Sequence, residues 1–362
     1  MPSTPPSLFD PPPLFERGAR PNVAHNVAVV QPLPGIGDMI WHLPHLHALA
    51  AAAGGAITLI AKPRSAADQV LGADPAVRDI IWLDRNPEGR RGRHDGMRGL
   101  LRLAQELRAR RFDAVVLLHH SVTLAAAARL AGIPVRAGYG YGAQRWLLNR
   151  GPVMSRRMLR QHQFQRATAW LRAAGVVLAE AEPRLAISDA ARKVVAARLE
   201  GVARPFVAIG IGASEPSRQW GAGGFAALVR GLRAMGWDRL VLLGGAAEAA
   251  LAGEIQRLAG GGGITVAIGW RLDEVAALLA EATFYVGNNT GVMNMAAAVG
   301  ILTYALFGTT PVFDHSRHII PIASPPDAAA GDDGMARITP EGVLAVIAGG
   351  TWGDGPGGAG TG

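Results

Sequence analysis

The sequence contains no cysteine and only two lysines, Lys62 and Lys193. The absence of cysteine excludes disulfides, thiolate metal sites, iron–sulfur clusters and cysteine nucleophiles. The longest apolar runs, such as residues 46–53, fall far short of the roughly 18 residues that span a bilayer, and the N-terminal segment has no apolar signal core. We therefore expect a cytoplasmic protein.

Length and composition predict two folded domains. The chain has 362 residues, of which 49% are hydrophobic and 18% charged, so there is enough apolar material for more than one core. Residues 1–25 are rich in proline and residues 349–362 in glycine, and we expect both ends to be flexible.

Short runs of Val, Ile and Leu alternate with helical patterns along the rest of the chain, which is typical of parallel sheets covered by helices on both faces. The pattern predicts two Rossmann-like α/β domains, residues 26–185 and 186–348, with ligands bound in a cleft at the carboxyl ends of the strands. The expected strands are 26–30, 57–61, 79–83 and 114–118 in the first domain, and 206–210, 239–245, 264–268, 283–287 and 302–308 in the second. The expected helices are 39–53, 97–110, 188–199, 225–235, 247–259, 272–281, 292–299 and 340–347, with Ser188 and Thr339 as N-caps.

Positive charge is concentrated in the first half. Residues 1–180 carry 23 Lys or Arg against 12 Asp or Glu, whereas the remainder carries 13 against 16. Residues 136–172 contain eight arginines and no acid. An anionic partner is indicated for this half. A nucleic acid is disfavoured because no zinc-finger spacing, aromatic RNA-binding signature or recognition-helix pattern accompanies the charge.

The first motif follows the first expected strand, where Gly35 and Gly37 precede Asp38 and a helix. It is not a dinucleotide fingerprint, since Ile40 stands where the third glycine would be needed. The pattern predicts an aspartate held at a helix N-terminus. A plain helix cap explains an isolated Asp38 equally well.

The second motif follows the first strand of the second domain. Gly212, Ala213 and Ser214 are small enough for backbone amides to approach a phosphate, and Arg218 could neutralise it. A tight turn with a surface arginine is the simpler explanation of this segment taken alone.

In the third motif, Asn288, Asn289 and Thr290 lead from a strand into a helix that starts at Gly291. Free amides at that helix N-terminus and the Thr290 hydroxyl form a candidate anion site. The alternative is an ordinary N-cap, although two preceding asparagines favour a binding site.

Together the three motifs resemble glycosyltransferase family 9, the heptosyltransferase-like enzymes of lipopolysaccharide core assembly, in order and in spacing. The first family motif matches Gly37, Asp38 and Pro44; the second matches Ile211 to Ser214, Arg218 and Trp220; the third matches Gly287 to Gly291, Asn294, Ala296 and Ala297. Leu242 to Gly245 and the Phe307, Gly308, Thr310, Pro311 segment fit as well.

The resemblance implies a GT-B fold with an N-terminal acceptor domain and a C-terminal domain for a nucleotide diphosphate sugar, which is a co-substrate; no cofactor and no metal are expected. It implies an inverting glycosyltransferase in which Asp38 is the general base. The expected donor and diphosphate residues are Gly212, Ser214, Arg218, Asn289, Thr290, Gly291 and Asn294, and the expected acceptor-side residues are Gly35, Gly37 and His42. The acceptor would be an anionic glycolipid or oligosaccharide, and the basic segment adds peripheral contact with the anionic inner membrane as a hypothesis.

Three positions depart from the family pattern. Arg218 stands where Lys is usual, Asn289 where an acid is frequent, and Asn294 where the family has His. These departures leave the donor sugar open. They also leave open a catalytically silent GT-B protein, although Asp38 argues against it. A sugar-nucleotide epimerase is disfavoured by the third motif, and a metal site at His42 and His45 by the lack of an accompanying carboxylate.

Overall fold

The computed structural model describes residues 14–15, 25–200, 204–308, 310–312, 315–324 and 334–350. The chain divides into two compact units, residues 1–181 and 182–362. The expected flexible ends, 1–25 and 349–362, lie outside the described residues apart from 14–15, 25 and 349–350. No helix in the described ranges is long and apolar enough to cross a membrane.

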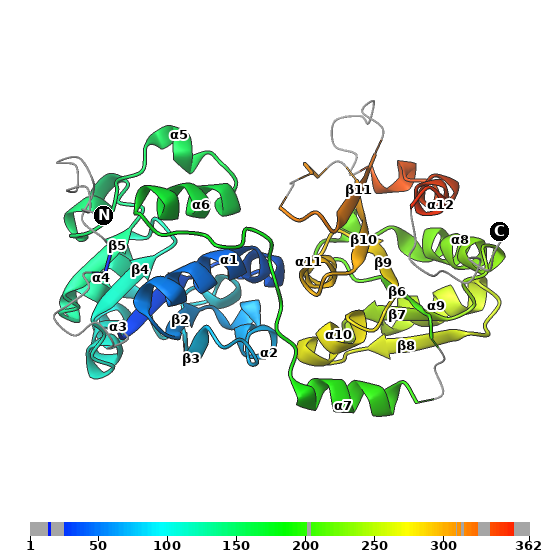
Figure 1. Ribbon diagram of the computed structural model, residues 1–362, viewed down its shortest axis with the longest axis horizontal. Coiled ribbons are helices and arrows are strands. Elements are labelled where there is room, and N and C mark those ends of the chain that lie inside the picture. The colour runs from blue at the N-terminus through cyan, green and yellow to red at the C-terminus, as the bar shows by residue number, and fades with distance from the viewer. Residues whose placement is uncertain are drawn as a thin grey trace, which may run out of the picture. The chain divides into compact units, whose positions relative to one another are not determined.

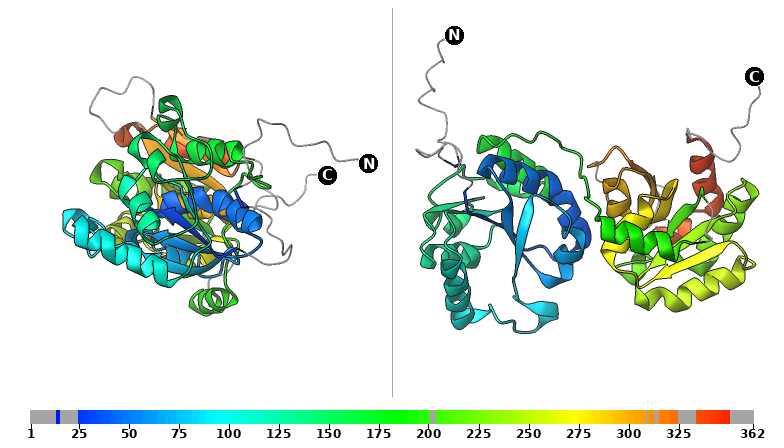
Figure 2. Two further views of the ribbon diagram at one scale, coloured as in Figure 1. Left: turned by 90° about the vertical axis from the view of Figure 1, so that its left-hand side faces the viewer. Right: turned by 60° about the horizontal axis from the view of Figure 1, so that its bottom comes forward.

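Unit 1 is a parallel sheet of five strands in the order β3-β2-β1-β4-β5, with helices on both of its faces (Figures 1 and 2). Its strands are β1 (Val27–Gln31), β2 (Ile57–Ala61), β3 (Val77–Trp82), β4 (Ala114–Leu117) and β5 (Val135–Gly138). Its helices are α1 (Ile36–Ala53), α2 (Ala67–Val70), α3 (Gly96–Ala109), α4 (Val122–Leu130), α5 (Arg156–Leu159) and α6 (Gln163–Ala173).

The core of unit 1 follows from the apolar strands. On one face, Val30, Val115 and Leu117 pack against Leu103 of α3 and Leu124 of α4 in one buried cluster. Helices α1 and α6 contact each other. Alternate residues of a strand face opposite sides of a sheet, so continuous apolar strands such as β1 require helices on both faces.

Unit 2 is a parallel sheet of six strands in the order β11-β10-β9-β6-β7-β8. Its strands are β6 (Val207–Gly210), β7 (Leu240–Gly244), β8 (Ile264–Ile268), β9 (Phe284–Asn288), β10 (Leu302–Gly308) and β11 (Ile319–Ala323). Its helices are α7 (Asp189–Arg198), α8 (Gly221–Ala234), α9 (Ala249–Leu258), α10 (Leu272–Leu279), α11 (Gly291–Ala298) and α12 (Pro340–Ala348). The predicted α/β fold with two parallel-sheet domains is confirmed.

The predicted caps are present in unit 2. Ser188 begins α7 and its hydroxyl accepts a hydrogen bond from the Ala191 amide at 3.1 Å. Thr339 begins α12 in the same way, accepting from Gly342 at 3.1 Å. Each side-chain cap satisfies a backbone N–H that the helix itself leaves without a partner.

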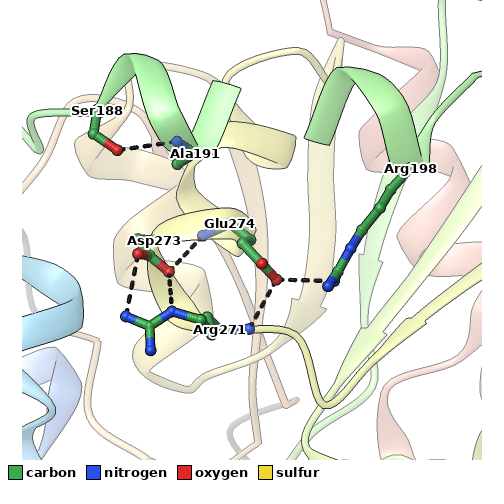
Figure 3. Close-up of polar contacts among 6 residues, drawn as sticks. All are labelled: Ser188, Ala191, Arg198, Arg271, Asp273 and Glu274. Atoms are coloured by element: carbon green, nitrogen blue, oxygen red, sulfur yellow. Dashed lines mark hydrogen bonds and ion pairs between the residues drawn. The ribbon is translucent and has the colours of Figure 1, made fainter. Parts of the chain in front are cut away.

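Helix α7 is attached to unit 2 through α10 (Figure 3). The buried Glu274 carboxylate accepts hydrogen bonds from the Arg198 guanidinium at 2.9 Å and from the Arg271 amide at 3.2 Å. The guanidinium also lies 4.7 Å from the ring centroid of Trp270. Because a buried carboxylate needs a partner, these contacts hold α7 against α10.

Several elements were not expected from the sequence. The predicted series omitted the helices α2, α4, α5 and α6 and the strands β5 and β11. Strand β11 contains Pro321, which cannot donate to a ladder and argues against a strand. It is tolerated because β11 is the edge strand of its sheet. Strand β5 has only four residues and includes Arg136 and Gly138, so its apolar signal is weak.

Gly210 at the end of β6 is required by a close approach. A Cβ at this position would collide with the buried hydroxyl of Tyr285 on the neighbouring strand β9. Replacing Gly210 by alanine should therefore lower the free energy of unfolding by about 1–3 kcal/mol, the usual effect of overpacking a core. Urea denaturation measures the change. The matched control is Gly253→Ala in α9, where a Cβ meets nothing within 4 Å and stability should not fall. Equal stability of Gly210→Ala and the parent would contradict the packing argument.

Candidate active site

Asp38 lies in the first turn of α1, which begins three residues earlier than the predicted start at residue 39. Gly35 occupies the N-cap position, and its amide donates to the Asp38 carboxylate at 3.1 Å. A Cβ on Gly35 would lie 2.7 Å from the same carboxylate oxygen, so a larger residue here would displace the Asp38 carboxylate. Asp38 therefore closes the helix start as a cap would, and it is half-buried in the first turn of α1.

Buried polar side chains form hydrogen bonds to the backbone of the loop and first helical turn that contain Asp38. The Gln31 side chain accepts from the Leu33 amide at 3.0 Å and donates to the Asp38 carbonyl at 3.2 Å. His42 Nδ1 donates to the same carbonyl at 2.7 Å. Gln31 and His42 are both fully buried. His42, an expected acceptor-side residue, is thus buried and in contact with the Asp38 backbone. The other two expected acceptor-side residues, Gly35 and Gly37, lie at the N-cap and in the first turn of α1.

Burial controls the protonation of this network. It raises the pKa of Asp38 above its ordinary value, and the hydrogen bond from Gly35 opposes the rise. It lowers the pKa of His42 to about 4, with nearby His162 and Arg166 acting in the same direction. His42 is therefore neutral near pH 7, whereas Asp38 holds a proton more readily than an exposed aspartate. A carboxylate with a raised pKa is suited to proton abstraction.

Basic side chains gather at the carboxyl end of the unit 1 sheet. The pKa of His119, which follows β4, is lowered to about 4 by burial and then by the charges of His120, Arg166, Lys62 and Arg85. A cavity of about 400 Å³ opens in this region without any acidic lining residue. It is lined by His120, Tyr141, Arg156, Leu159, Arg160 and Arg166. Such a cavity is suited to an anionic group.

In unit 2, the side chain of Asn288 connects the loop of the third motif to the loop of the second motif by hydrogen bonds. It is fully buried at the end of β9, and its amide donates to the Gly212 carbonyl at 3.0 Å and to Gln219 Oε1 at 3.3 Å. Gln219 in turn donates to the Ile211 carbonyl at 2.8 Å. Because β6 and β9 are neighbours, their loops meet at one edge of the sheet. The structure thereby brings the Gly212 loop beside the start of α11.

The N-terminus of α11 is built by the third motif. Thr290 is the N-cap residue, but its side chain makes no capping hydrogen bond. Asn289, Thr290 and Gly291 are partly exposed, so the first amides of the helix can be reached by a ligand. Asn294 is buried one turn further on, and its amide donates to the Thr290 carbonyl at 3.0 Å.

The loop after β6 carries the other predicted donor residues. Ser214 is exposed, and Arg218 is partly exposed with its guanidinium 3.5 Å from the Glu215 carboxylate. Trp220 is structural, because its indole N–H donates to the Ile338 carbonyl at 2.8 Å and its ring packs edge-on against Phe225.

Two polar residues of these sites, Gln31 and Glu248, were not predicted, and Asn288 was predicted as part of the third motif but not as a link between the two loops. Gln31 and Asn288 both end apolar strands, and that position is the signal that could have revealed Gln31. Glu248 follows Gly244 and Gly245 at the end of β7, where its carboxylate lies close to Gly245 and Gly212. A carboxylate there suits sugar hydroxyl groups better than phosphates. Within the described ranges, no group of three or more His, Asp or Glu is placed to hold a metal ion.

Comparison with known proteins decides the family. A model of glycosyltransferase family 9 (heptosyltransferase) matches residues 100–317, more than half of the chain. The chain belongs to glycosyltransferase family 9. It is a glycosyltransferase, as the motifs predicted. The matched range includes the Gly212 loop and the start of α11, whereas Asp38 lies before it.

Solved structures show the same GT-B fold over nearly the whole chain. A family 9 glycosyltransferase from Veillonella parvula DSM 2008 superposes with a TM-score of 0.73 at 21% identity, covering 90% of this chain and 97% of that one. The E. coli ADP-heptose lipopolysaccharide heptosyltransferase II gives 0.68 at 22% identity, covering 89% and 97%. E. coli heptosyltransferase WaaC with ADP-2-deoxy-2-fluoro heptose gives 0.67 at 20% identity, covering 89% and 99%. No curated protein matches this family 9 chain in sequence.

Proposed function

We propose that this enzyme is an inverting, metal-independent glycosyltransferase that moves heptose or another hexose-type sugar from a nucleoside diphosphate sugar to a lipopolysaccharide-core or other lipid-linked acceptor. The observation that carries the proposal is the junction made by Asn288, which joins the Gly212 loop to the start of α11. That junction places small residues and open helix amides together, as a diphosphate requires.

In the proposed reaction, an acceptor hydroxyl oxygen attacks C1 of the donor sugar. Asp38 takes the hydroxyl proton as the new C–O bond forms, and the bond from C1 to the phosphate oxygen breaks on the opposite face. The raised pKa of Asp38 supports this role, because a stronger base accepts the proton more readily. The products are the glycosylated acceptor and a nucleoside diphosphate.

The leaving diphosphate gains negative charge, which the chain's own groups would stabilise. Arg218 provides a guanidinium, Ser214 a hydroxyl, and Gly291 stands at the positive end of the α11 dipole. Since these groups supply the positive potential, transfer should be unaffected by EDTA. Glu248 would accept hydrogen bonds from hydroxyl groups of the donor.

The acceptor would bind unit 1 through its anionic groups. The cavity lined by Arg156, Arg160 and Arg166 supports this assignment, since it combines three guanidinium groups with no carboxylate. A lipid-linked acceptor also requires contact with a membrane surface. We assign that contact to a basic patch of exposed residues, Arg145, Trp146, Val153, Arg156, Arg157 and Arg160.

The basic patch combines charge with apolar side chains, as a bilayer interface requires. Trp146 is 72% exposed and Val153 65%, so both add exposed apolar surface to the patch. The Arg145 guanidinium lies 4.3 Å from the Trp146 ring centroid. Arginine would bind anionic headgroups while tryptophan enters the interface.

A thermal-shift panel of nucleoside diphosphate sugars tests the proposed function, beginning with ADP-heptose. A ligand present at 100 times its Kd adds about 2.7 kcal/mol to the free energy of unfolding. We expect one donor class to stabilise the protein and to be consumed when a lipopolysaccharide-core acceptor is added. Stabilisation by no nucleotide sugar in the panel would contradict the proposal, and stabilisation without transfer to any acceptor would favour the catalytically silent protein.

Replacing Arg218 by alanine should weaken nucleoside diphosphate binding about tenfold to a hundredfold, the range for a hydrogen bond to a charged group. Binding of the nucleoside alone should hardly change, because the lost guanidinium faces the phosphates. Calorimetry with both ligands measures the difference, and Arg230→Ala on α8, whose guanidinium donates to the Leu258 carbonyl at 2.9 Å, is the matched control. Equal losses for the two ligands would show that Arg218 acts elsewhere.

A further inference from the structure

His315 and Asn294 form a buried hydrogen-bonded pair in unit 2. His315 Nε2 lies 2.7 Å from Asn294 Oδ1, and the two residues are 8% and 3% exposed. An amide oxygen only accepts, so Nε2 carries the proton and donates. The Asn294 nitrogen then faces the Thr290 carbonyl, to which it donates at 3.0 Å. The amide is therefore oriented from both ends.

The segment that carries His315 is itself anchored. The neighbouring Ser316 hydroxyl donates to the Glu182 carboxylate, and the Arg317 amide donates to the same carboxylate at 3.2 Å. The His318 carbonyl accepts from the Thr303 amide of β10 at 2.8 Å. These bonds limit the movement of His315, so its imidazole is held against α11.

The pair acts on the first turn of α11. The Thr290 carbonyl accepts two hydrogen bonds from Asn294, one from its backbone amide at 3.3 Å and one from its side-chain amide at 3.0 Å. Thr290 has no side-chain capping bond of its own, so this second bond to its carbonyl adds to the restraint on the N-cap peptide. The direction of the following amides depends on that peptide.

We propose that His315 is a positioning residue of the donor site. Through Asn294 it holds the Thr290 carbonyl, and it thereby orients the amides at the start of α11 toward the diphosphate. This inference rests on the proposed function, because it presumes that a nucleoside diphosphate binds at α11.

The test compares nucleoside diphosphate and nucleoside binding by calorimetry, using whichever of ADP, GDP, UDP and CDP the parent binds most tightly. His315→Asn should weaken diphosphate binding about three- to tenfold, the worth of one hydrogen bond, and leave nucleoside binding unchanged. His315→Gln should bind nearly as the parent does, because its amide N–H lies one methylene further out than that of asparagine and can reach Asn294 Oδ1, as His315 Nε2 does. The double variant His315→Asn with Asn294→His restores an imidazole–amide pair and should bind more tightly than either single variant.

His318→Asn is the matched control, since this partly exposed histidine belongs to the same segment and is not one of the pair. Thermal melting of every variant reports the folded fraction. The inference would be overturned if His315→Asn bound the nucleoside diphosphate as tightly as the parent does. Equal losses for diphosphate and nucleoside would overturn it as well, as would a double variant that binds no more tightly than the better of the two single variants. A parent that binds none of the four nucleotides would instead overturn the proposed donor site, and the role of His315 with it.

Discussion

Replacing Asp38 by asparagine is expected to leave donor binding nearly unchanged and to reduce sugar transfer by about 10²- to 10⁴-fold, the usual contribution of a general base. Asparagine has the shape of aspartate, and its oxygen can still accept the hydrogen bond from Gly35. It cannot take a proton at neutral pH. The change therefore removes the base and retains the turn.

Single-turnover rates at saturating donor measure this effect, and calorimetry measures donor affinity. Asp68→Asn is the control, because Asp68 is an exposed aspartate in the first turn of α2 in the same unit. Unchanged transfer by Asp38→Asn, at equal folded fraction, would leave Asp38 as a helix cap only.

The transfer rate should also depend on the protonation of Asp38. Its pKa is raised by burial, so the rate should fall with decreasing pH around a midpoint above 3.8, the ordinary value for aspartate. The sign follows because only the deprotonated carboxylate accepts a proton. A pH–rate profile with no loss on the acid side would contradict the assignment.

Neutralising Arg156, Arg157 and Arg160 together, each to glutamine, is expected to reduce partitioning onto anionic vesicles by about 100-fold. Each basic residue near an anionic surface contributes about 1 kcal/mol, and the three are exposed in α5 and just after it. The parent should bind anionic vesicles more tightly than neutral ones. Its binding to anionic vesicles should decline as salt is added, because ions screen the attraction.

Co-sedimentation with vesicles of mixed anionic and neutral lipid measures this partitioning. The matched control replaces the same three residues by lysine, which keeps the charge and should keep most of the binding. Failure of the parent to bind anionic vesicles at low salt would remove the membrane contact from the proposed function. In that case the cavity at Arg166 would serve a soluble anionic acceptor.

The fold class could be predicted from the sequence because it depends on local patterns. Continuous apolar strands such as β1 and β6 can be buried only between two layers of helices, and the intervening helical segments allow parallel pairing. The predicted strands 57–61, 264–268 and 302–308 agree residue for residue with β2, β8 and β10. Edge elements were less visible, since β11 contains a proline and pairs on one side only.

The sequence by itself determined the parallel α/β fold, the caps at Ser188 and Thr339, the concentration of positive charge in the first half, and the chain order of those strands and helices that it predicted. Only the tertiary structure decided that Asn288 reaches the Gly212 loop, that Gln31 and His42 share the Asp38 carbonyl, and that His315 meets Asn294. Helix and strand patterns arise from neighbours a few residues apart, so they can be read along the chain. The contacts of Gln31 with Asp38, of His315 with Asn294 and of Asn288 with Gly212 join residues 7 to 76 positions apart, and the longest of them depends on which strands become neighbours in the sheet.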